Sequence, residues 1–165
     1  MKSKAITLLA TFALTGFTGT IVRAQDIFVS NQGVPGSVSE FDPSGNLVTT
    51  FNTGLDDPTG LAFDSSGNLY VANQFGTVAK FDSSGNLINA SFVTPGEAFD
   101  VTFDKSGDLY VSNYTSNNGG TVTEYDSNGN LINVSFASGL VGTSGLAFDS
   151  SGNLFVVNSN RFKTS

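Results

Sequence analysis

The side chains that could do chemistry in this chain are oxygen donors. The 165-residue sequence contains fourteen Asp and Glu residues but no His and no Cys. Without His it lacks the commonest general base and every His-based catalytic triad. Carboxylate and amide oxygens are ligands that Ca²⁺ prefers. The chemistry to look for is therefore calcium binding or acid–base catalysis by carboxyl groups.

Asp100 breaks an otherwise regular internal pattern. It stands where the corresponding repeats have Gly60 and Gly145, and Glu97 precedes it by three residues, opposite Asp57. The position falls at the start of an expected innermost strand, which makes Asp100 and Glu97 the candidate ligand or metal residues. The alternative is a solvated loop Asp. That alternative is favoured because one carboxylate neither holds a metal nor runs acid–base catalysis alone. No catalytic residue is assigned.

A second set of carboxylates belongs to a short motif, Asp-x-x-Gly-(Asn/Asp)-Leu, that occurs six times. An Asp that accepts backbone hydrogen bonds, followed by a Gly with positive φ, is typical of a β-hairpin turn. A calcium loop needs more acidic oxygens than the motif offers. We therefore predict structural turns, with calcium binding as the alternative. The turn pairs are Asp42/Gly45, Asp64/Gly67, Asp82/Gly85, Asp104/Gly107, Asp126/Gly129 and Asp149/Gly152.

Two further sets of residues recur at fixed repeat positions. An Asn ends each of four equivalent segments and is interpreted as a cap on the next turn rather than a ligand. An aromatic residue near the start of three of these segments is interpreted as core. The Asn residues are Asn31, Asn73, Asn113 and Asn158, and the aromatic residues are Tyr70, Tyr110 and Phe155.

The elements that must position these residues form a repeat of 40 to 45 residues. That period is typical of a four-stranded propeller blade. In one repeat we expect strands at residues 60–63, 69–73, 77–81 and 87–92. The first recognisable strand has no preceding innermost strand, and the chain holds about thirteen strands in all. The predicted fold is all-β, a partial β-propeller of about three four-stranded antiparallel blades with an incomplete ring.

The repeat resembles the NHL family. The resemblance rests on the segment Pro-Thr-Gly-Leu-Ala-Phe-Asp-x-x-Gly-Asn-Leu-Tyr-Val-Ala-Asn at residues 58–73 and on Thr-Val-Ala-Lys-Phe-Asp-x-x-Gly at 77–85. It extends over nearly all of residues 26–158. The family implies a propeller of usually six blades that serves as a binding platform, with a minority of enzymes. In the related calcium-dependent gluconolactonase-like propellers, carboxylate and Asn side chains hold the metal, so Asp100 would be a remnant of such a site.

The first residues resemble a secretory signal. Lys2 and Lys4 precede an apolar run at residues 5–14, and small residues flank a cut near Ala24. The expected organisation is a signal peptide at 1–24, an NHL-like partial propeller at 25–158 and an irregular tail at 159–165. The expected location is secreted or extracytoplasmic, in a bacterial periplasm or outside the cell.

The charge of the chain limits which classes of partner it is expected to bind. Cleavage near Ala24 would leave four basic residues against fourteen acidic ones. Such a surface repels nucleic acid and anionic membranes, and no membrane anchor is seen. A protein or glycan partner is expected, as is self-association through open blade edges.

The predicted function is a non-catalytic exported binding or scaffolding module, a fragment of a longer protein. The alternatives are a calcium-dependent lactonase- or lyase-like enzyme, with calcium as the cofactor, and an inactive truncated product. The predicted non-catalytic module requires no cofactor.

Overall fold

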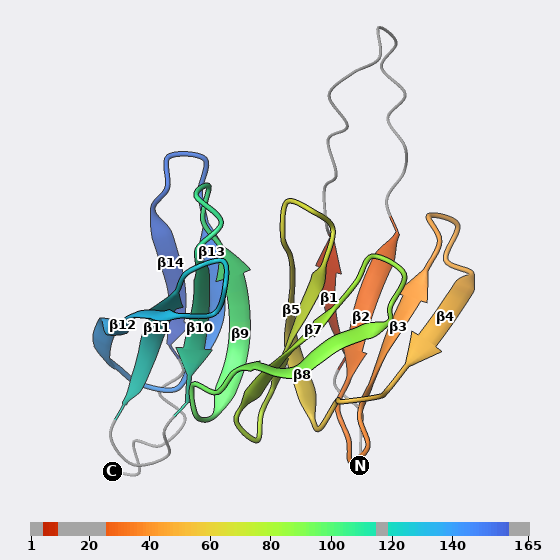
Figure 1. Cartoon of the computed structure of the whole chain (residues 1–165), viewed down its shortest axis with the longest axis horizontal. Coiled ribbons are helices and arrows are strands. Elements are labelled where there is room, and N and C mark those ends of the chain that lie inside the picture. The colour runs from red at the N-terminus through yellow and green to blue at the C-terminus, as the bar shows by residue number, and fades with distance from the viewer. Residues whose placement is uncertain (1–4, 10–25, 115–118, 159–165) are drawn as a thin grey trace, which may run out of the picture.

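The computed structural model describes residues 5–9, 26–114 and 119–158, and these residues form antiparallel β-sheets (Figure 1). Three sheets have four strands in the orders β1-β2-β3-β4, β5-β6-β7-β8 and β12-β11-β10-β9, and β13 pairs with β14 alone. We call the first three sheets blades 1, 2 and 3, and β13–β14 the half-blade. The strands are β1 (Ala5–Leu9), β2 (Ile27–Asn31), β3 (Ser37–Phe41), β4 (Leu47–Phe51), β5 (Pro58–Phe63), β6 (Leu69–Asn73), β7 (Thr77–Phe81), β8 (Leu87–Val93), β9 (Ala98–Phe103), β10 (Leu109–Asn113), β11 (Gly120–Tyr125), β12 (Leu131–Leu140), β13 (Thr143–Phe148) and β14 (Leu154–Asn158).

The recurring motif forms the turns inside these sheets. In the first turn Gly45 N–H donates to the Asp42 carbonyl at 2.9 Å, and Asp42 N–H donates to the Asn46 carbonyl at 2.9 Å. Asp42 Oδ1 also accepts the N–H groups of Ser44 and Asn46. Gly45 has a φ of 82°, which only Gly adopts without strain. The same pair of backbone bonds recurs in all six motifs, so each one reverses the chain between two adjacent strands.

Two turn glycines, Gly85 and Gly129, do more than the local turn role that the motif predicts. Both have the expected positive φ, 79° and 85°, and each N–H donates to the carbonyl of its motif Asp. A Cβ at Gly85, however, would lie 3.3 Å from the ring of Phe51 in blade 1. A Cβ at Gly129 would lie 3.2 Å from the ring of Phe92 in blade 2 and 3.1 Å from the Phe92 carbonyl oxygen.

The purely local interpretation of Gly85 and Gly129 was therefore incomplete. Their turns pack on the outermost strand of the preceding blade, so a side chain at either position would press on a neighbouring sheet as well as strain the turn. A repeat motif carries no signal for this contact, because Phe51 and Phe92 lie 34 and 37 residues earlier in the chain. At three other turn glycines, Gly45, Gly107 and Gly152, a Cβ would meet nothing within 4 Å.

Alternation along the strands gives each blade two apolar faces. One face of blade 2 packs on blade 1 around Val38, which is fully buried, and Phe28 meets Phe63 edge-on with ring centroids 4.9 Å apart. The buried cluster between these two blades consists of Val38, Leu55, Leu61, Leu69, Val71, Ala79 and Phe81. Each blade is therefore held mainly by its neighbours rather than by a single central core.

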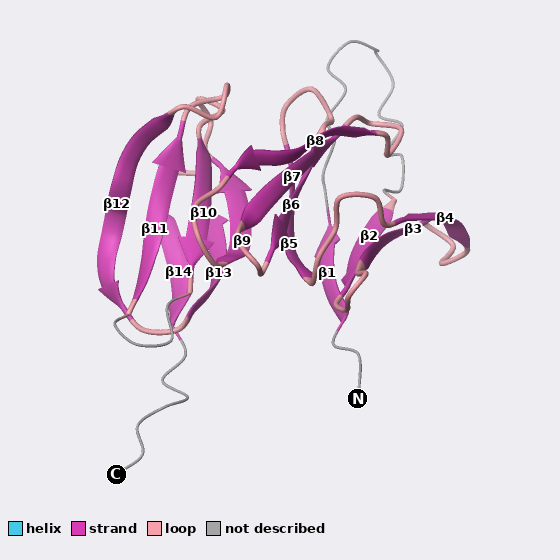
Figure 2. Ribbon diagram, turned by 60° about the horizontal axis from the view of Figure 1, so that its bottom comes forward, coloured by secondary structure: helices cyan, strands magenta, loops and turns pink. Residues whose placement is uncertain are grey.

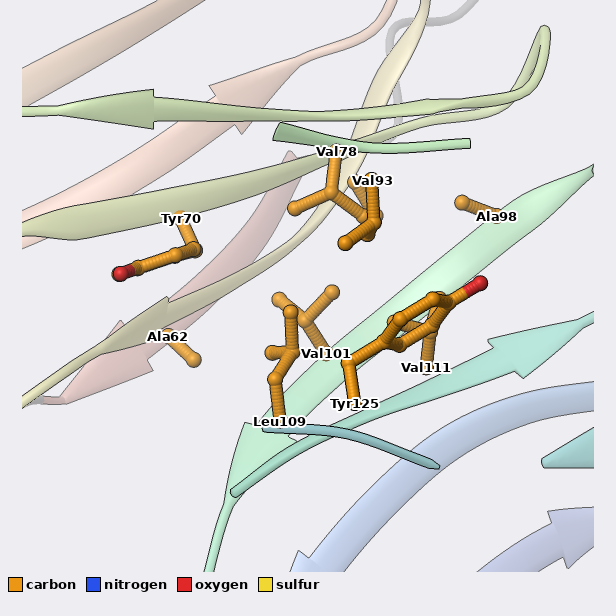
Figure 3. Close-up of a cluster of buried hydrophobic side chains, with 10 residues drawn as sticks. Ala62, Tyr70, Val78, Val93, Ala98, Val101, Leu109, Val111 and Tyr125 are labelled. Atoms are coloured by element: carbon orange, nitrogen blue, oxygen red, sulfur yellow. The ribbon is translucent and has the colours of Figure 1, made fainter. Parts of the chain in front are cut away.

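The opposite face of blade 2 packs on blade 3 (Figure 3). Tyr70 belongs to this contact. It is 2% exposed, and its ring centroid lies 4.9 Å from that of Phe103 of blade 3. The cluster consists of Ala62, Tyr70, Ala72, Val78, Val93, Ala98, Val101, Leu109, Val111 and Tyr125. The position of Tyr70 in the core follows from the side-chain alternation expected of its strand.

The architecture matches the expected partial propeller. The four expected strands of blade 2 appear as β5 to β8, with β6 and β7 at their expected bounds. Blade 1 and blade 3 lie at opposite ends of the described chain in two views, so the sheets do not close into a ring (Figures 1 and 2). The half-blade has two strands where blades 2 and 3 have four.

The first blade differs from expectation in one respect. Residues 5–9, inside the apolar run of the predicted signal, form β1, which pairs with β2 from Ala5↔Asn31 to Leu9↔Ile27. This supplies the innermost strand that the repeat pattern lacks there, because an apolar run can satisfy an open strand edge by backbone pairing alone. Lys2, Lys4, Ala24 and the tail at 159–165 lie outside the described residues. Within those residues, no helix has the length and apolar character needed to cross a membrane.

Candidate functional site at the inner strands

Asp100 lies on β9, the first strand of blade 3 and an edge strand of its sheet. β9 contacts β5 of blade 2 on one side and β13 of the half-blade on the other. These three inner strands correspond in the repeat, and Asp100 is the only charged residue among them. The repeat therefore places a single carboxyl group where three successive sheets meet.

The hydrogen bonds of Asp100 join two of these sheets. Leu146 N–H of β13 donates to Asp100 Oδ2 at 2.7 Å, and Val101 N–H donates to Oδ1 at 3.0 Å. Asp100 N–H itself donates to Ser112 Oγ at 3.0 Å. Burial raises the pKa of the Asp100 carboxyl to about 6, although the two N–H donors oppose that rise. The carboxyl group can therefore exchange a proton near neutral pH while it bridges blade 3 and the half-blade.

Gly60 of β5 makes room for Asp100. A Cβ atom at Gly60 would lie 2.5 Å from Asp100 Cα and closer still to Oδ1. Such an approach is possible only because Gly60 has no side chain. Sequence comparison of the repeats identified the exchange of Gly for Asp at position 100, but the contact with Gly60 involves residues far apart along the chain.

Glu97 lies in the loop before β9, and its side chain is exposed. Its carbonyl accepts a hydrogen bond from Tyr114 N–H at 2.9 Å, so its backbone holds the loop. No group of three or more acidic residues placed to hold a metal occurs in residues 5–9, 26–114 and 119–158. Ca²⁺ takes six to eight oxygen ligands. Among the described residues, Asp100 and Glu97 therefore belong to no acidic cluster of that size.

The recurring Asn residues hold loops and hairpins together. Asn73 accepts the Asp56 N–H on Oδ1 at 3.1 Å, and its Nδ2 donates to the Gly54 carbonyl and to Thr77 Oγ1. Asn31 Nδ2 donates to the Oγ atoms of two Ser residues on β3. Asn73 therefore bonds loop backbone, as the capping interpretation expects, whereas these bonds of Asn31 join side chains across the β2–β3 hairpin.

Asn113 differs from Asn73 in a way that the sequence does not reveal. Its Nδ2 donates to Thr121 and Thr123, but its buried Oδ1 has no hydrogen-bond partner within the part of the chain that the structure describes. In Asn73 the same atom accepts a loop N–H. An orphaned amide oxygen is a suitable cation or water ligand, although one such atom falls far short of the donor set that Ca²⁺ needs.

Comparison with known proteins supports the fold. No family model matches the sequence, and no curated protein matches it significantly. Among solved structures, a gluconolactonase from Xanthomonas campestris is similar with a TM-score of 0.64 and 22% identity, over 84% of this chain and 52% of that one. Regucalcin, a calcium-binding protein from Agrobacterium tumefaciens, is similar with a TM-score of 0.57 and 16% identity, over 76% of this chain and 46% of that one.

A third similar structure is virginiamycin B lyase from Staphylococcus aureus, with a TM-score of 0.59 and 11% identity over 95% of this chain and 68% of that one. The structural neighbours are β-propeller proteins, consistent with the open arrangement of blades seen here. This chain spans about half the length of the gluconolactonase that it matches.

Proposed function

We propose that this chain is one half of a lactonase- or lyase-type β-propeller, and that any such activity belongs to a completed ring. The observation that carries the proposal is Asp100, a partly buried carboxyl group with a pKa of about 6 on an inner strand of the fold shared with gluconolactonase. A carboxyl group with that pKa is suited to accept a proton from water near neutral pH. The similarity in fold to gluconolactonase favours a lactonase or lyase reaction, but it is an argument by analogy.

The described residues of one chain supply few groups that could take part in such a reaction. Asp100 already accepts two N–H groups, and no cluster of three acids accompanies it among the described residues. Proton acceptance by Asp100 is the one step that these residues offer, so substrate binding and stabilisation of the carbonyl oxygen would require groups from the rest of a ring. A single isolated chain is therefore expected to be inactive.

The test combines calcium binding with lactone hydrolysis. The purified full chain would be separated by size, and each fraction assayed for gluconolactone hydrolysis with added CaCl₂ or with EDTA. Calcium-dependent hydrolysis by the larger species is expected, at least tenfold lower in Asp100→Asn. Asp108→Asn is the matched control because Asn occupies that turn position in the other five motifs. Absence of hydrolysis and of any calcium-induced rise in melting temperature in every fraction would overturn the enzyme proposal.

The second candidate is a non-catalytic module that binds a protein or a glycan. It is favoured by the two backbone donors on the Asp100 carboxyl group, which indicate a structural role for that residue. Calcium addition and Asp100→Asn would then leave partner binding unchanged, while a glycan array or pull-down would identify the ligand.

We also propose that the repeats are of the NHL type and that the chain is exported. The support is the sequence motif at residues 58–85 and the signal-like residues 1–24. N-terminal sequencing of protein recovered from the periplasm or medium is expected to begin at Gln25. Recovery with residues 5–9 intact would contradict cleavage and agree with the pairing of β1 on β2.

A further inference from the structure

Two apolar side chains of β14 are exposed where their repeat equivalents are buried. Phe155 is 60% exposed, whereas Tyr70 and Tyr110 at the same position are 2% and 5% exposed. Val157 is 58% exposed, whereas its equivalents Ala72 and Ser112 are fully buried. Because the local strand is the same in all three sheets, the difference must come from what packs against it.

In the interior of the chain, the next sheet covers this face. The Tyr70 ring packs against Phe103 of blade 3 at 4.9 Å, and the Tyr110 ring packs against Phe148 of the half-blade at 5.0 Å. Phe155 occupies the same place on the half-blade, but no sheet follows it within the described residues. The exposed face is thus a continuation of an interface that the chain already uses twice.

The opposite end of the chain presents the complementary face. Ile27 and Val29 on β2 and Phe41 on β3 are partly buried and point away from blade 2 by alternation with Phe28 and Val38. Their three equivalents in blade 2 are almost fully buried against blade 1. They are Leu69, Val71 and Phe81. Blade 1 therefore carries the receiving half of the same interface, with no preceding sheet among the described residues.

We infer that two copies of this chain associate head to tail, with the Phe155–Val157 face of each half-blade packed on the Ile27–Val29–Phe41 face of the other copy's blade 1. One chain corresponds to 52% of the similar gluconolactonase, so two copies match the length of one propeller. Two such contacts related by a two-fold axis close a ring, whereas one alone leaves it open. This inference uses sheet faces rather than open strand edges, and it does not depend on any catalytic activity.

The test is the oligomeric state of the full chain, measured by sedimentation velocity from about 1 to 200 μM. The parent is expected as a closed dimer. Phe155→Glu and Val29→Glu each place a charge in both copies of the contact and are expected to give monomers, with at least a tenfold rise in the dissociation constant. Phe75→Glu is the matched control, because Phe75 is 68% exposed in the β6–β7 loop, outside both faces.

Mixing the two variants separates head-to-tail association from other arrangements. Phe155→Glu keeps an intact blade 1 face and Val29→Glu keeps an intact half-blade face, so the mixture is expected to regain one contact. It should form a heterodimer that is weaker than the parent because the ring no longer closes. Far-ultraviolet circular dichroism and thermal melting would establish that both variants fold.

Four results would overturn the inference. They are a parent that stays monomeric at 200 μM, a parent dimer unaffected by Phe155→Glu, a dimer lost with Phe155→Glu but kept with Val29→Glu, and open oligomers that grow with concentration. The third result would indicate that half-blades pair with each other. None of these results depends on calcium or lactone hydrolysis, so this inference and the proposed function can fail separately.

Discussion

The middle and the end of this chain contain equivalent strands in different surroundings. Tyr70 of β6 is enclosed by Phe92 of its own blade and Phe103 of the next, while Phe155 of β14 is largely exposed. Both residues follow the same turn motif and are the second residue of equivalent five-residue strands. The comparison shows that the motif determines the hairpin, whereas the neighbouring sheet determines whether the hairpin's aromatic residue contributes to stability.

The largest expected effect contrasts Tyr70→Ala with Phe155→Ala. Truncating a large buried aromatic costs about 3–5 kcal/mol, and Tyr70 also donates a hydrogen bond to Asp64. Truncating an exposed side chain costs less than about 0.5 kcal/mol. The free energy of unfolding would be measured by urea denaturation in the Val29→Glu background, which is expected to be monomeric. Equal losses for the two variants would contradict the burial difference between the middle and the end.

Whether the sequence predicts a feature of this protein depends on how far apart along the chain the interacting residues lie. The turns and strands of blade 2 are predictable because Asp64, Gly67 and their bonded partners lie within five residues. The core position of Tyr70 follows from alternation. The core interpretation was wrong for Phe155. The repeat pattern predicts on which face of the sheet a side chain lies, but not whether another sheet covers that face.

The candidate site is less predictable because its contacts are distant along the chain. The sequence singles out Asp100, yet its partner Leu146 is 46 residues away and Gly60 lies in the preceding blade. The unpaired Oδ1 of Asn113 also has no clear sequence signal, since Asn73 ends an equivalent Leu-Tyr-Val-x-Asn segment and its Oδ1 is paired. Strand β1 was missed because its residues carry the pattern of a signal peptide rather than that of the repeat.

The second prediction is that the free energy of unfolding depends on pH through Asp100, in the middle region of the chain. Burial raises the pKa of Asp100 from 3.8 to about 6, so between these values the folded state holds a proton that the unfolded state has lost. The free energy of unfolding should therefore fall as pH rises through this window, by up to about 3 kcal/mol, and then level off. Urea denaturation from pH 4 to 7 would measure this slope.

Asp100→Asn is the control, since Asn does not titrate but can still accept the Leu146 N–H. The variant should lose the decline between pH 4 and 6. The exposed turn residues Asp42 and Asp149 act in the opposite direction. Hydrogen bonds from Asn46 and Asn153 lower their pKa, so their stabilisation is lost at lower pH as they take up protons. A parent whose stability rises steadily from pH 4 to 6 would contradict the raised pKa of Asp100.

The third prediction compares two glycines at the same repeat position. Gly60→Ala introduces a methyl group into backbone and carboxyl atoms of Asp100, with an expected cost of about 1–3 kcal/mol. At the end of the chain, a Cβ at Gly145 meets only the side chain of Val157, at 3.2 Å. Because that side chain is exposed and can move, Gly145→Ala should cost less than Gly60→Ala.

A double-mutant cycle sharpens the comparison at Gly60. In an Asp100→Gly background the carboxyl oxygen is gone, so Gly60→Ala should cost less than it does in the parent, although the contact with the backbone at position 100 remains. Chemical denaturation of the four proteins gives the coupling energy. A coupling energy of zero would mean that Gly60 is not needed to accommodate the Asp100 side chain.

The smallest expected effect tests whether the hairpins themselves differ between the two regions. Gly107 in blade 3 and Gly152 in the half-blade have φ values of 89° and 87°, and a Cβ at either would meet nothing within 4 Å. The cost of Gly→Ala is then almost purely the strain of a left-handed backbone, about 1 kcal/mol at each site. Similar losses in denaturation experiments are expected, because the strain arises within the turn. A much larger loss for Gly107→Ala would show that the neighbouring sheets also determine the turn geometry, and that hairpin formation and blade packing are not separable in this chain.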